Sequence, residues 1–191
     1  MTDPRLTEQP SLAVRVPTHE VACQAAVLDA YDAHHDELWG FLLDATRDGS
    51  VAEDLLQEVF LRLLREARAG RMPELVRPWL YRVAANLAIS RGRRLVSARR
   101  WFERFGVAEH RAAVAESPEP RYLRHEAAED LDLVLAGLRP DARAALLLSA
   151  EGFSGREIAA AIGRTEIATR TLLCRARTQV RHQLAGTGGA T

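Results

Sequence analysis

The chain has 191 residues, 47% of them hydrophobic and 27% charged, which is enough apolar surface for one large domain or two small ones. All 26 basic residues are arginines, and 26 acidic residues balance them, so the net charge argues against a uniformly basic nucleic-acid-binding protein. No apolar run in the sequence reaches the roughly 18 residues that a membrane-spanning helix needs, and we expect no export leader. We therefore expect a cytoplasmic protein without membrane insertion.

The N-terminal segment, residues 1–24, is polar, contains three prolines and has no periodicity, which predicts a disordered tail. From Val27 onward, apolar residues recur at steps of three and four, as in an amphipathic helix. A turn follows, after which Ser50 is a candidate N-cap that forms a capping box with Glu53. The second helix then extends to Arg68.

A break that contains glycine and proline precedes a third helix, which we expect from about Pro78 toward Arg100. The segment 105–123 loses periodicity and contains a Ser-Pro-Glu-Pro run, a composition typical of flexible linkers. This linker separates a first helical domain, residues 25–104, from a second, residues 124–185.

The second domain carries the pattern of a helix-turn-helix. Glu157 can complete a capping box with Ser154 in a short helix, which Gly163 then ends, and Ala159 is small enough for another helix to cross closely. The expected helices are Arg124–Gly137, Asp141–Ala150, the short helix from Ser154 to Gly163 and a helix capped by Thr165 that reaches Leu184, before a flexible tail at 186–191. The predicted fold is all-α, with two small helical domains joined by a flexible linker.

The final helix has one apolar and one polar face. The apolar stripe consists of Thr169, Leu173, Ala176 and Val180. The opposite face carries Thr171, Cys174, Arg175, Thr178 and His182, and Arg170 and Arg181 flank it. Such a helix suits the major groove, because arginine side chains can pair with guanine edges or hold phosphates. The alternative is a solvated helix in a plain bundle.

The second helix has an exposed leucine on its polar side. Its expected core stripe is Ala52, Leu56, Val59, Phe60, Leu63 and Ala67. Opposite this stripe lie Asp54, Gln57, Glu58, Leu61 and Arg65. A leucine amid polar residues fits a surface that docks on a partner, although single exposed leucines are also common.

The third helix carries a mixed polar and aromatic surface. We expect Leu80, Val83, Ala84 and Leu87 to face inward. The outer side carries Arg82, Asn86 and Arg93, with Trp79 and Ser90 beside them, and the charge is extended by Arg91, Arg94, Arg99 and Arg100. This mixture can hold phosphates and stack on bases. An ordinary arginine-rich helix, solvated or paired with the acidic first helix, is the alternative.

Charge alternates along the chain. The segments 29–58 and 109–132 are mainly acidic, whereas 62–104 and 156–181 are mainly basic. This alternation fits a chain that presents different faces to different partners.

Three motifs in order give the chain a resemblance to a known family. Ala52–Arg62 resembles the polymerase-binding helix of sigma factor domain 2, and Trp79–Ile89 resembles the helix that contacts the minus-10 promoter element. Leu138–Pro140, Glu157–Ala159 and Arg175–Arg177 are similar to domain 4, which contacts the minus-35 element. The chain thus resembles extracytoplasmic-function (ECF) sigma factors of the sigma-70 family.

This resemblance implies a role for each polar face. Core RNA polymerase would bind Asp54, Gln57, Glu58 and Leu61. Minus-10 DNA would lie along Trp79, Arg82, Asn86, Ser90, Arg93 and Arg94. The minus-35 element would meet Arg170, Thr171, Cys174 and Arg175. The implied function is an alternative sigma factor that directs promoter-specific initiation, with promoter DNA, core polymerase and an anti-sigma factor as partners.

The sequence predicts neither a catalytic constellation nor a cofactor. Cys23 and Cys174 lack the spacing of a zinc site, and His34 and His35 are adjacent rather than one helical turn apart. We therefore expect no metal site and no enzymatic activity. Two alternative functions remain at this stage: a stand-alone helix-turn-helix regulator, and a sigma-like decoy that binds an anti-sigma factor.

Overall fold

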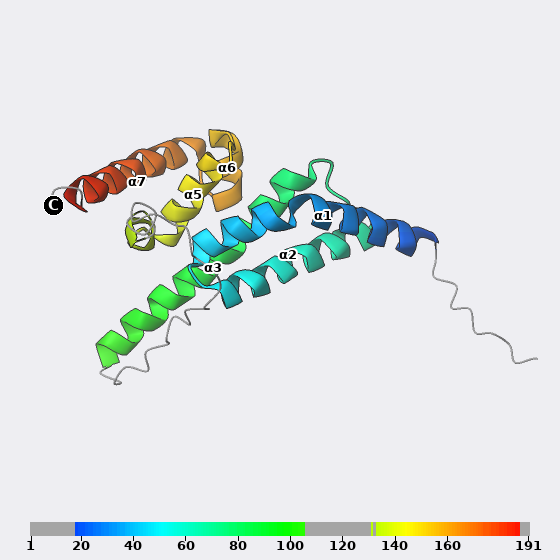
Figure 1. Ribbon diagram of the computed structural model, residues 1–191, viewed down its shortest axis with the longest axis horizontal. Helices are drawn as coiled ribbons and strands as arrows, with labels where there is room; N and C mark the ends of the chain where they lie inside the picture. Colours follow the sequence, from blue (N-terminus) through cyan, green and yellow to red (C-terminus); the bar gives the residue numbers. More distant parts are fainter. Residues whose placement is uncertain (1–17, 106–130, 132, 188–191) are drawn as a thin grey trace, which may run out of the picture.

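The computed structural model describes residues 18–105, 131 and 133–187, and within these ranges all regular secondary structure is helical. The all-α prediction is confirmed. The helices are α1 (Thr18–Thr46), α2 (Gly49–Arg68), α3 (Val76–Phe105), α5 (Pro140–Ala150), α6 (Gly155–Ile162) and α7 (Glu166–Thr187), with a further helical stretch at 133–136 (Figure 1).

The reversal between α1 and α2 fixes where α2 begins. Arg47 adopts a left-handed backbone with φ of 64°, and the side chain of Asp48 accepts a hydrogen bond from the backbone N–H of Val51 at 3.0 Å. Asp48 is therefore the N-cap of α2, and the prediction that Ser50 caps this helix is wrong. Ser50 lies inside the first turn of α2.

The first helix is longer than expected. Because α1 begins at Thr18, the prediction of a tail that reaches residue 24 is wrong for residues 18–24. Two contacts with the end of α2 hold this extension: Arg68 donates hydrogen bonds to Glu20, and the thiol of Cys23 donates to the carbonyl of Ala67 at 3.3 Å. Residues 1–17 lie outside the described part.

Other boundaries also shift. The third helix begins at Val76, before Pro78, and extends to Phe105, so it includes the first residue of the predicted linker. The rest of the predicted linker, 106–123, lies outside the described residues. Of the helix predicted from Arg124 to Gly137, the structure describes residue 131 and residues 133–137, which are helical up to 136. The final helix ends at Thr187, so residues 186 and 187 belong to it rather than to a tail, and 188–191 are not described.

The helix-turn-helix prediction is confirmed in its local geometry. The hydroxyl of Ser154 accepts a hydrogen bond from the backbone N–H of Glu157, whose carboxylate accepts one from the N–H of Ser154. Gly163 ends α6 in the left-handed conformation with φ of 66°, and the N–H of Arg164 donates to the carbonyl of Ala159 at 3.0 Å. Thr165 then caps α7 by accepting from the N–H of Ala168.

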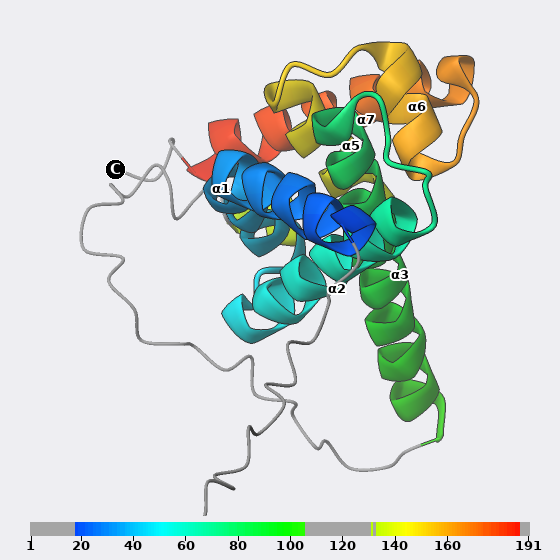
Figure 2. The same cartoon turned by 90° about the vertical axis from the view of Figure 1, so that its right-hand side faces the viewer.

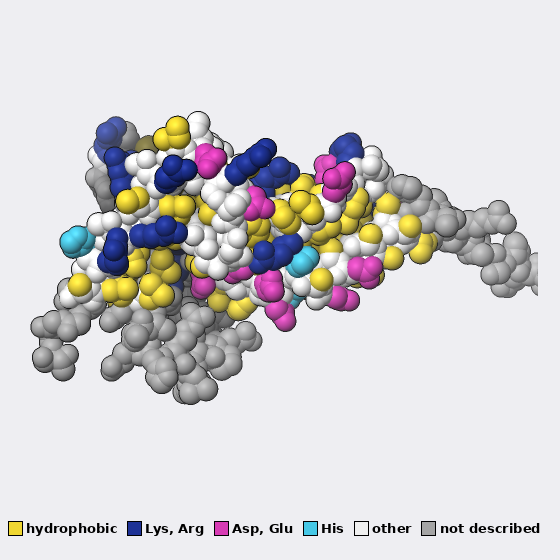
Figure 3. Space-filling model, turned by 90° about the horizontal axis from the view of Figure 1, so that it is seen from above, with side chains coloured by type: hydrophobic (Ala, Val, Ile, Leu, Met, Phe, Trp, Pro, Cys, Tyr) yellow, Lys and Arg dark blue, Asp and Glu magenta, His cyan; other side chains and the backbone are white. Residues whose placement is uncertain are grey.

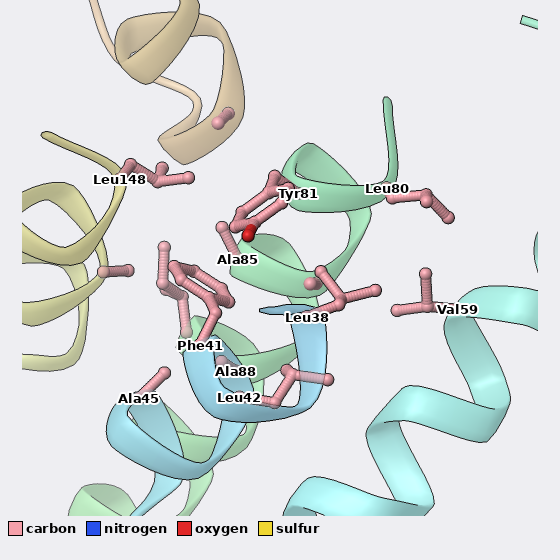
Figure 4. Packing of buried hydrophobic residues seen from close by; sticks show 14 of the residues in the cluster. Leu38, Phe41, Leu42, Ala45, Val59, Leu80, Tyr81, Ala85, Ala88 and Leu148 are labelled. Carbon is pink, nitrogen blue, oxygen red and sulfur yellow. The ribbon is translucent and has the colours of Figure 1, made fainter. Parts of the chain in front are cut away.

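The two helical units share one core. Helices α5 and α6 pack on α3, and α5 also contacts α1 (Figure 2). Figure 4 shows buried side chains from α1, α2, α3 and α5 meeting in a single cluster, with Leu148 of α5 near Phe41 and Tyr81. At Gly92 the approach is so close that an added Cβ would lie 2.7 Å from Cγ of Pro140.

A half-buried arginine, Arg143, links the two units. The guanidinium of Arg143 donates to the carbonyl of Ala45 in α1 at 3.0 Å and to the carbonyls of Leu135 and Ala136 at 2.8 and 2.9 Å. Burial lowers the pKa of Arg143, but arginine remains charged in proteins. These bonds satisfy carbonyls at helix ends that would otherwise lack partners.

Candidate nucleic-acid interface

We call Asp54, Gln57, Glu58 and Leu61 the α2 outer face. The opposite side of α2 buries all six residues of the predicted core stripe, which is confirmed: Ala52, Leu56, Val59, Phe60, Leu63 and Ala67. Leu61 has 49% of its surface exposed. The outer face therefore presents one apolar side chain among polar ones.

Two arginines hold the carboxylate of Glu58. Arg62 lies one turn further along α2 and donates to it at 2.7 Å, and Arg65 lies 3.6 Å away. The hydrogen bond from Arg62 keeps the pKa of Glu58 below its usual value, so this carboxylate stays charged. The sequence analysis missed the pair, although the four-residue spacing of Glu58 and Arg62 indicates it.

We call Trp79, Arg82, Asn86, Ser90, Arg93 and Arg94 the α3 outer face. All are exposed except Trp79, which is half-buried. The side-chain amide of Asn86 donates to the carbonyl of Arg82 at 3.0 Å, which keeps it along the helix surface. One helix thus brings the predicted minus-10 residues to one side of the molecule.

Helix α6 covers the beginning of this face. A pocket of about 250 Å³ lies between the two helices, with Trp79 and Arg82 on one side and Glu157 and Ala160 on the other. Pro73, Leu75 and Pro78 complete its lining. The N-terminal end of the α3 outer face therefore faces the second helical unit across this pocket.

The sequence analysis missed the buried tyrosine beside this contact. Tyr81 is fully buried, its ring meets those of Phe41 and Phe153, and its hydroxyl donates to the carboxylate of Glu151 at 3.0 Å. Arg77 donates to the same carboxylate at 3.1 Å, and its guanidinium lies over the Tyr81 ring. Burial, and then the charge of Glu151, raises the pKa of Tyr81, so its hydroxyl stays protonated.

We call Arg170, Thr171, Cys174 and Arg175 the α7 outer face, and all four side chains are exposed. On the opposite side, Thr169, Leu173 and Ala176 are buried as predicted, whereas Val180 is half-buried. Figure 3 shows arginine side chains gathered at the left of the molecule, where Figure 1 places α7.

The start of α7 adds an apolar residue that the sequence analysis did not select. Ile167 has 78% of its surface exposed, and its carbonyl accepts a hydrogen bond from the hydroxyl of Thr171 at 3.1 Å. An exposed isoleucine beside Arg170 can contact a thymine methyl group in a major groove. Its position at the first turn after a helix-turn-helix break is the signal that indicates it.

The described residues do not include a group of three or more acidic, histidine or cysteine side chains that could hold a metal ion. Cys23 and Cys174 are free thiols. None of the helices in the described ranges combines the length and the hydropathy needed to cross a bilayer.

Comparisons with known proteins match both helical units. Residues 30–98 match the Sigma-70 region 2 family model, and residues 128–180 match the Sigma-70, region 4 model. The chain is 36% identical over 150 residues to the RNA polymerase sigma factor CarQ of Myxococcus xanthus, a match that covers 77% of this chain and 82% of that protein. It is 32% identical to the ECF RNA polymerase sigma factor SigE of Mycolicibacterium smegmatis, with 80% of this chain and 59% of that protein covered.

Two solved structures have a similar fold. The sigma factor RpoE of Bartonella quintana, solved with the anti-sigma factor NepR, has a TM-score of 0.60 and 23% identity, covering 85% of this chain and 96% of that one. CnrH, solved with the cytosolic domain of CnrY, has a TM-score of 0.58 and 19% identity, covering 88% and 96%. These structures share the fold of this chain, and the family models and sequence relatives show that the chain belongs to the ECF group of sigma-70 RNA polymerase sigma factors, as an alternative sigma factor that directs promoter-specific transcription.

Proposed function

We propose that the chain binds core RNA polymerase through the α2 outer face, and promoter DNA through the α3 and α7 outer faces. The minus-10 element would lie along α3 and the minus-35 element along α7. The observation that carries this assignment is the placement of three separate polar faces, each on its own helix. Behind the α2 face, the whole predicted stripe is buried. Behind the α7 face, three residues of the predicted stripe are buried.

The α2 outer face has the chemistry of a protein-docking surface. Leu61 supplies an exposed apolar anchor, and Asp54 and Glu58 surround it with negative charge. Because Arg62 and Arg65 already hold Glu58 in one position, little side-chain entropy is lost when a partner binds there. We expect the partner surface to be basic with an apolar depression.

The two DNA-binding units must separate at a promoter. Helix α6 packs against both α3 and α7, so at about 10 Å per helix pair the axes of α3 and α7 are roughly 20 Å apart beside α6. The minus-35 and minus-10 elements, by contrast, lie about 25 base pairs apart, which is about 85 Å of duplex at 3.4 Å per base pair. We call the packing of α5 and α6 on α3 the closed arrangement. A chain in this arrangement cannot bind both promoter elements at once.

We propose an anti-sigma factor as a further partner, because the sigma factor RpoE, whose fold is similar, was solved with the anti-sigma factor NepR. Binding to the closed arrangement would keep α6 over the beginning of the α3 outer face. We also propose that the chain works in the cytoplasm, where polymerase and chromosome are, and that it has no enzymatic activity of its own, so catalysis belongs to the polymerase.

The polymerase assignment is tested by Leu61→Asp, with Leu133→Asp as a matched control at an exposed leucine in the second unit. A charge in an apolar pocket is costly, so we expect Leu61→Asp to lower affinity for immobilised core polymerase by about 100-fold, equal to about 3 kcal/mol. Leu133→Asp should bind like the original chain. Equal affinity of both variants would show that the α2 outer face is not the docking surface.

A further inference from the structure

The outer side of α7 has an uncharged middle and charged edges. At about 100° per residue, four side chains lie within an arc of about 60° on the side opposite the buried stripe: Ile167, Thr171, Cys174 and Thr178. We call them the α7 central stripe, and all four are exposed. An arginine lies along each edge, about 70° from the centre of the stripe: Arg170 on one side and Arg175 on the other.

The stripe begins with an isoleucine in the first turn of α7. Among the described residues, Ile167 is the most exposed large apolar side chain, with 78% of its surface accessible. Neither solubility nor helix propensity favours a β-branched apolar residue at such a position. In a recognition helix, the first turn is the part that contacts base edges. A base edge that covers Ile167 therefore accounts for an isoleucine at this place.

The two threonines of the stripe have their hydroxyl hydrogens engaged. Thr171 donates its hydroxyl hydrogen to the carbonyl of Ile167 at 3.1 Å, and Thr178 donates to the carbonyl of Cys174 at 3.0 Å. Each threonine oxygen can still accept a hydrogen bond, and each methyl group can make apolar contacts. Apart from the weak donor of the Cys174 thiol, the stripe therefore offers apolar groups and acceptors.

The edges of the stripe suit the phosphate backbone. The guanidinium of Arg170 lies 3.6 Å from the carboxylate of Glu166, which is about 110° from the centre of the stripe. This ion pair draws Arg170 away from the middle of the face. Arginines at the edges of a helix in the major groove can hold phosphates, and such contacts position a protein without recognising its sequence.

We propose that the α7 central stripe recognises thymine in the major groove, with Ile167 packed against the C5-methyl group. This proposal rests on the proposed function of the α7 outer face. Thymine is the base that presents a methyl group in this groove, and its partner adenine presents an amino group that the Thr171 oxygen can accept from. A guanine edge presents two acceptors, which the stripe does not match.

The test uses the full chain and duplexes that it selects from a random-sequence library. Each thymine of a selected duplex is replaced in turn by deoxyuridine, which lacks the methyl group and keeps the hydrogen-bonding groups. The variants are Ile167→Ala and Ile167→Val, and the control is Leu133→Ala, at another exposed apolar residue of the second unit. Affinity is measured by fluorescence anisotropy.

A methyl-sized apolar contact changes affinity by about fourfold. We expect at least one thymine position at which uridine weakens binding by about fourfold for the original chain and for Leu133→Ala. Ile167→Ala should bind the thymine duplex more weakly and should not distinguish it from the uridine duplex, because the methyl group and the isoleucine form one contact. Ile167→Val, which keeps the β-branch, should retain the preference for thymine.

A second probe places the same methyl group on another base. At the position where uridine weakens binding, 5-methylcytosine should bind more tightly than cytosine for the original chain and equally for Ile167→Ala. Equal affinity for thymine and uridine at every position, an unchanged preference in Ile167→Ala, or the selection of no duplex would overturn the proposal.

Arg175→Gln separates this proposal from the proposed function. If Arg175→Gln weakens binding of the selected duplex while uridine has no effect at any position, α7 binds DNA and the thymine assignment is wrong. If neither Arg175→Gln nor Ile167→Ala weakens binding, the duplex is bound elsewhere, and both the thymine assignment and the α7 part of the proposed function are wrong.

Discussion

At the scale of single residues, Asp141 links the start of α5 to the end of the helix-turn-helix break. It is 2% exposed, accepts a hydrogen bond from the N–H of Ala142 at 3.1 Å, and pairs with the guanidinium groups of Arg164 and Arg139. Burial raises the pKa of Asp141, but the hydrogen bond from Arg164 and the two positive charges outweigh it, so the pKa lies below its ordinary value of 3.8. The charged form therefore stabilises the fold.

We expect Asp141→Asn to lower the free energy of unfolding at neutral pH by about 2 kcal/mol, because Arg164 loses its charged partner. A group with a depressed pKa stabilises the folded state above its unfolded pKa, and this contribution disappears as the pH falls through the folded value. The difference between the original chain and the variant should therefore shrink below pH 3.8. Urea denaturation across this range measures it. The exposed control Asp29→Asn should have little effect, and a pH-independent difference for Asp141→Asn would contradict the ion-pair explanation.

At the scale of elements, both ends of α6 were predictable from the sequence because one cap pattern marks them, whereas the start of α2 offered two candidate caps. Ser154, Glu157 and Gly163 form the only cap pattern near α6, and the structure bears it out. Near α2, Asp48 and Ser50 both have the chemistry of an N-cap. The left-handed backbone at Arg47 brings Asp48 into the capping position, and no local pattern in the sequence indicates that conformation at Arg47.

Because Asp48 and not Ser50 caps α2, alanine substitutions at these two positions should change the free energy of unfolding by different amounts. Asp48→Ala removes the acceptor for the N–H of Val51 and should lower the free energy of unfolding by about 1 kcal/mol. Ser50→Ala, inside the first turn, should be neutral or slightly stabilising, because alanine has the higher helix propensity. Thermal or urea unfolding compares the two. A larger loss for Ser50→Ala would mean that the helix begins two residues later.

At the scale of the whole molecule, the sequence predicted part of the side of α3 that packs within the first helical unit. It did not predict the side of α3 that the second unit covers. Leu80 and Ala84 are buried as predicted, whereas Val83 and Leu87 are half-buried. Further residues that the sequence analysis did not place inside are also buried, because α5 and α6 cover a second side of the helix: Tyr81, Ala85, Ala88 and Ile89. Packing between units far apart in the chain leaves no periodic signal in either helix.

Gly92→Ala tests this packing. The added methyl would lie 2.7 Å from Cγ of Pro140 and 2.8 Å from its Cβ, so the contact between α3 and α5 must widen. We expect the radius of gyration from small-angle scattering to increase, while helicity by circular dichroism stays the same or rises. The control Gly40→Ala, which meets nothing within 4 Å, should leave the radius unchanged. An unchanged radius for Gly92→Ala would contradict the close approach of the two units.

We propose for the chain as a whole that a docking face on α2 and two DNA-binding faces, on α3 and α7, allow it to direct core polymerase to promoters. The most direct measurement is in vitro transcription with purified core RNA polymerase and a library of genomic fragments from the organism that encodes the chain, with start sites mapped by sequencing. The account predicts initiation at a limited set of sites that share two upstream motifs, with initiation lost for Leu61→Asp and retained for Leu133→Asp. Initiation at no site above the level of core polymerase alone would contradict it.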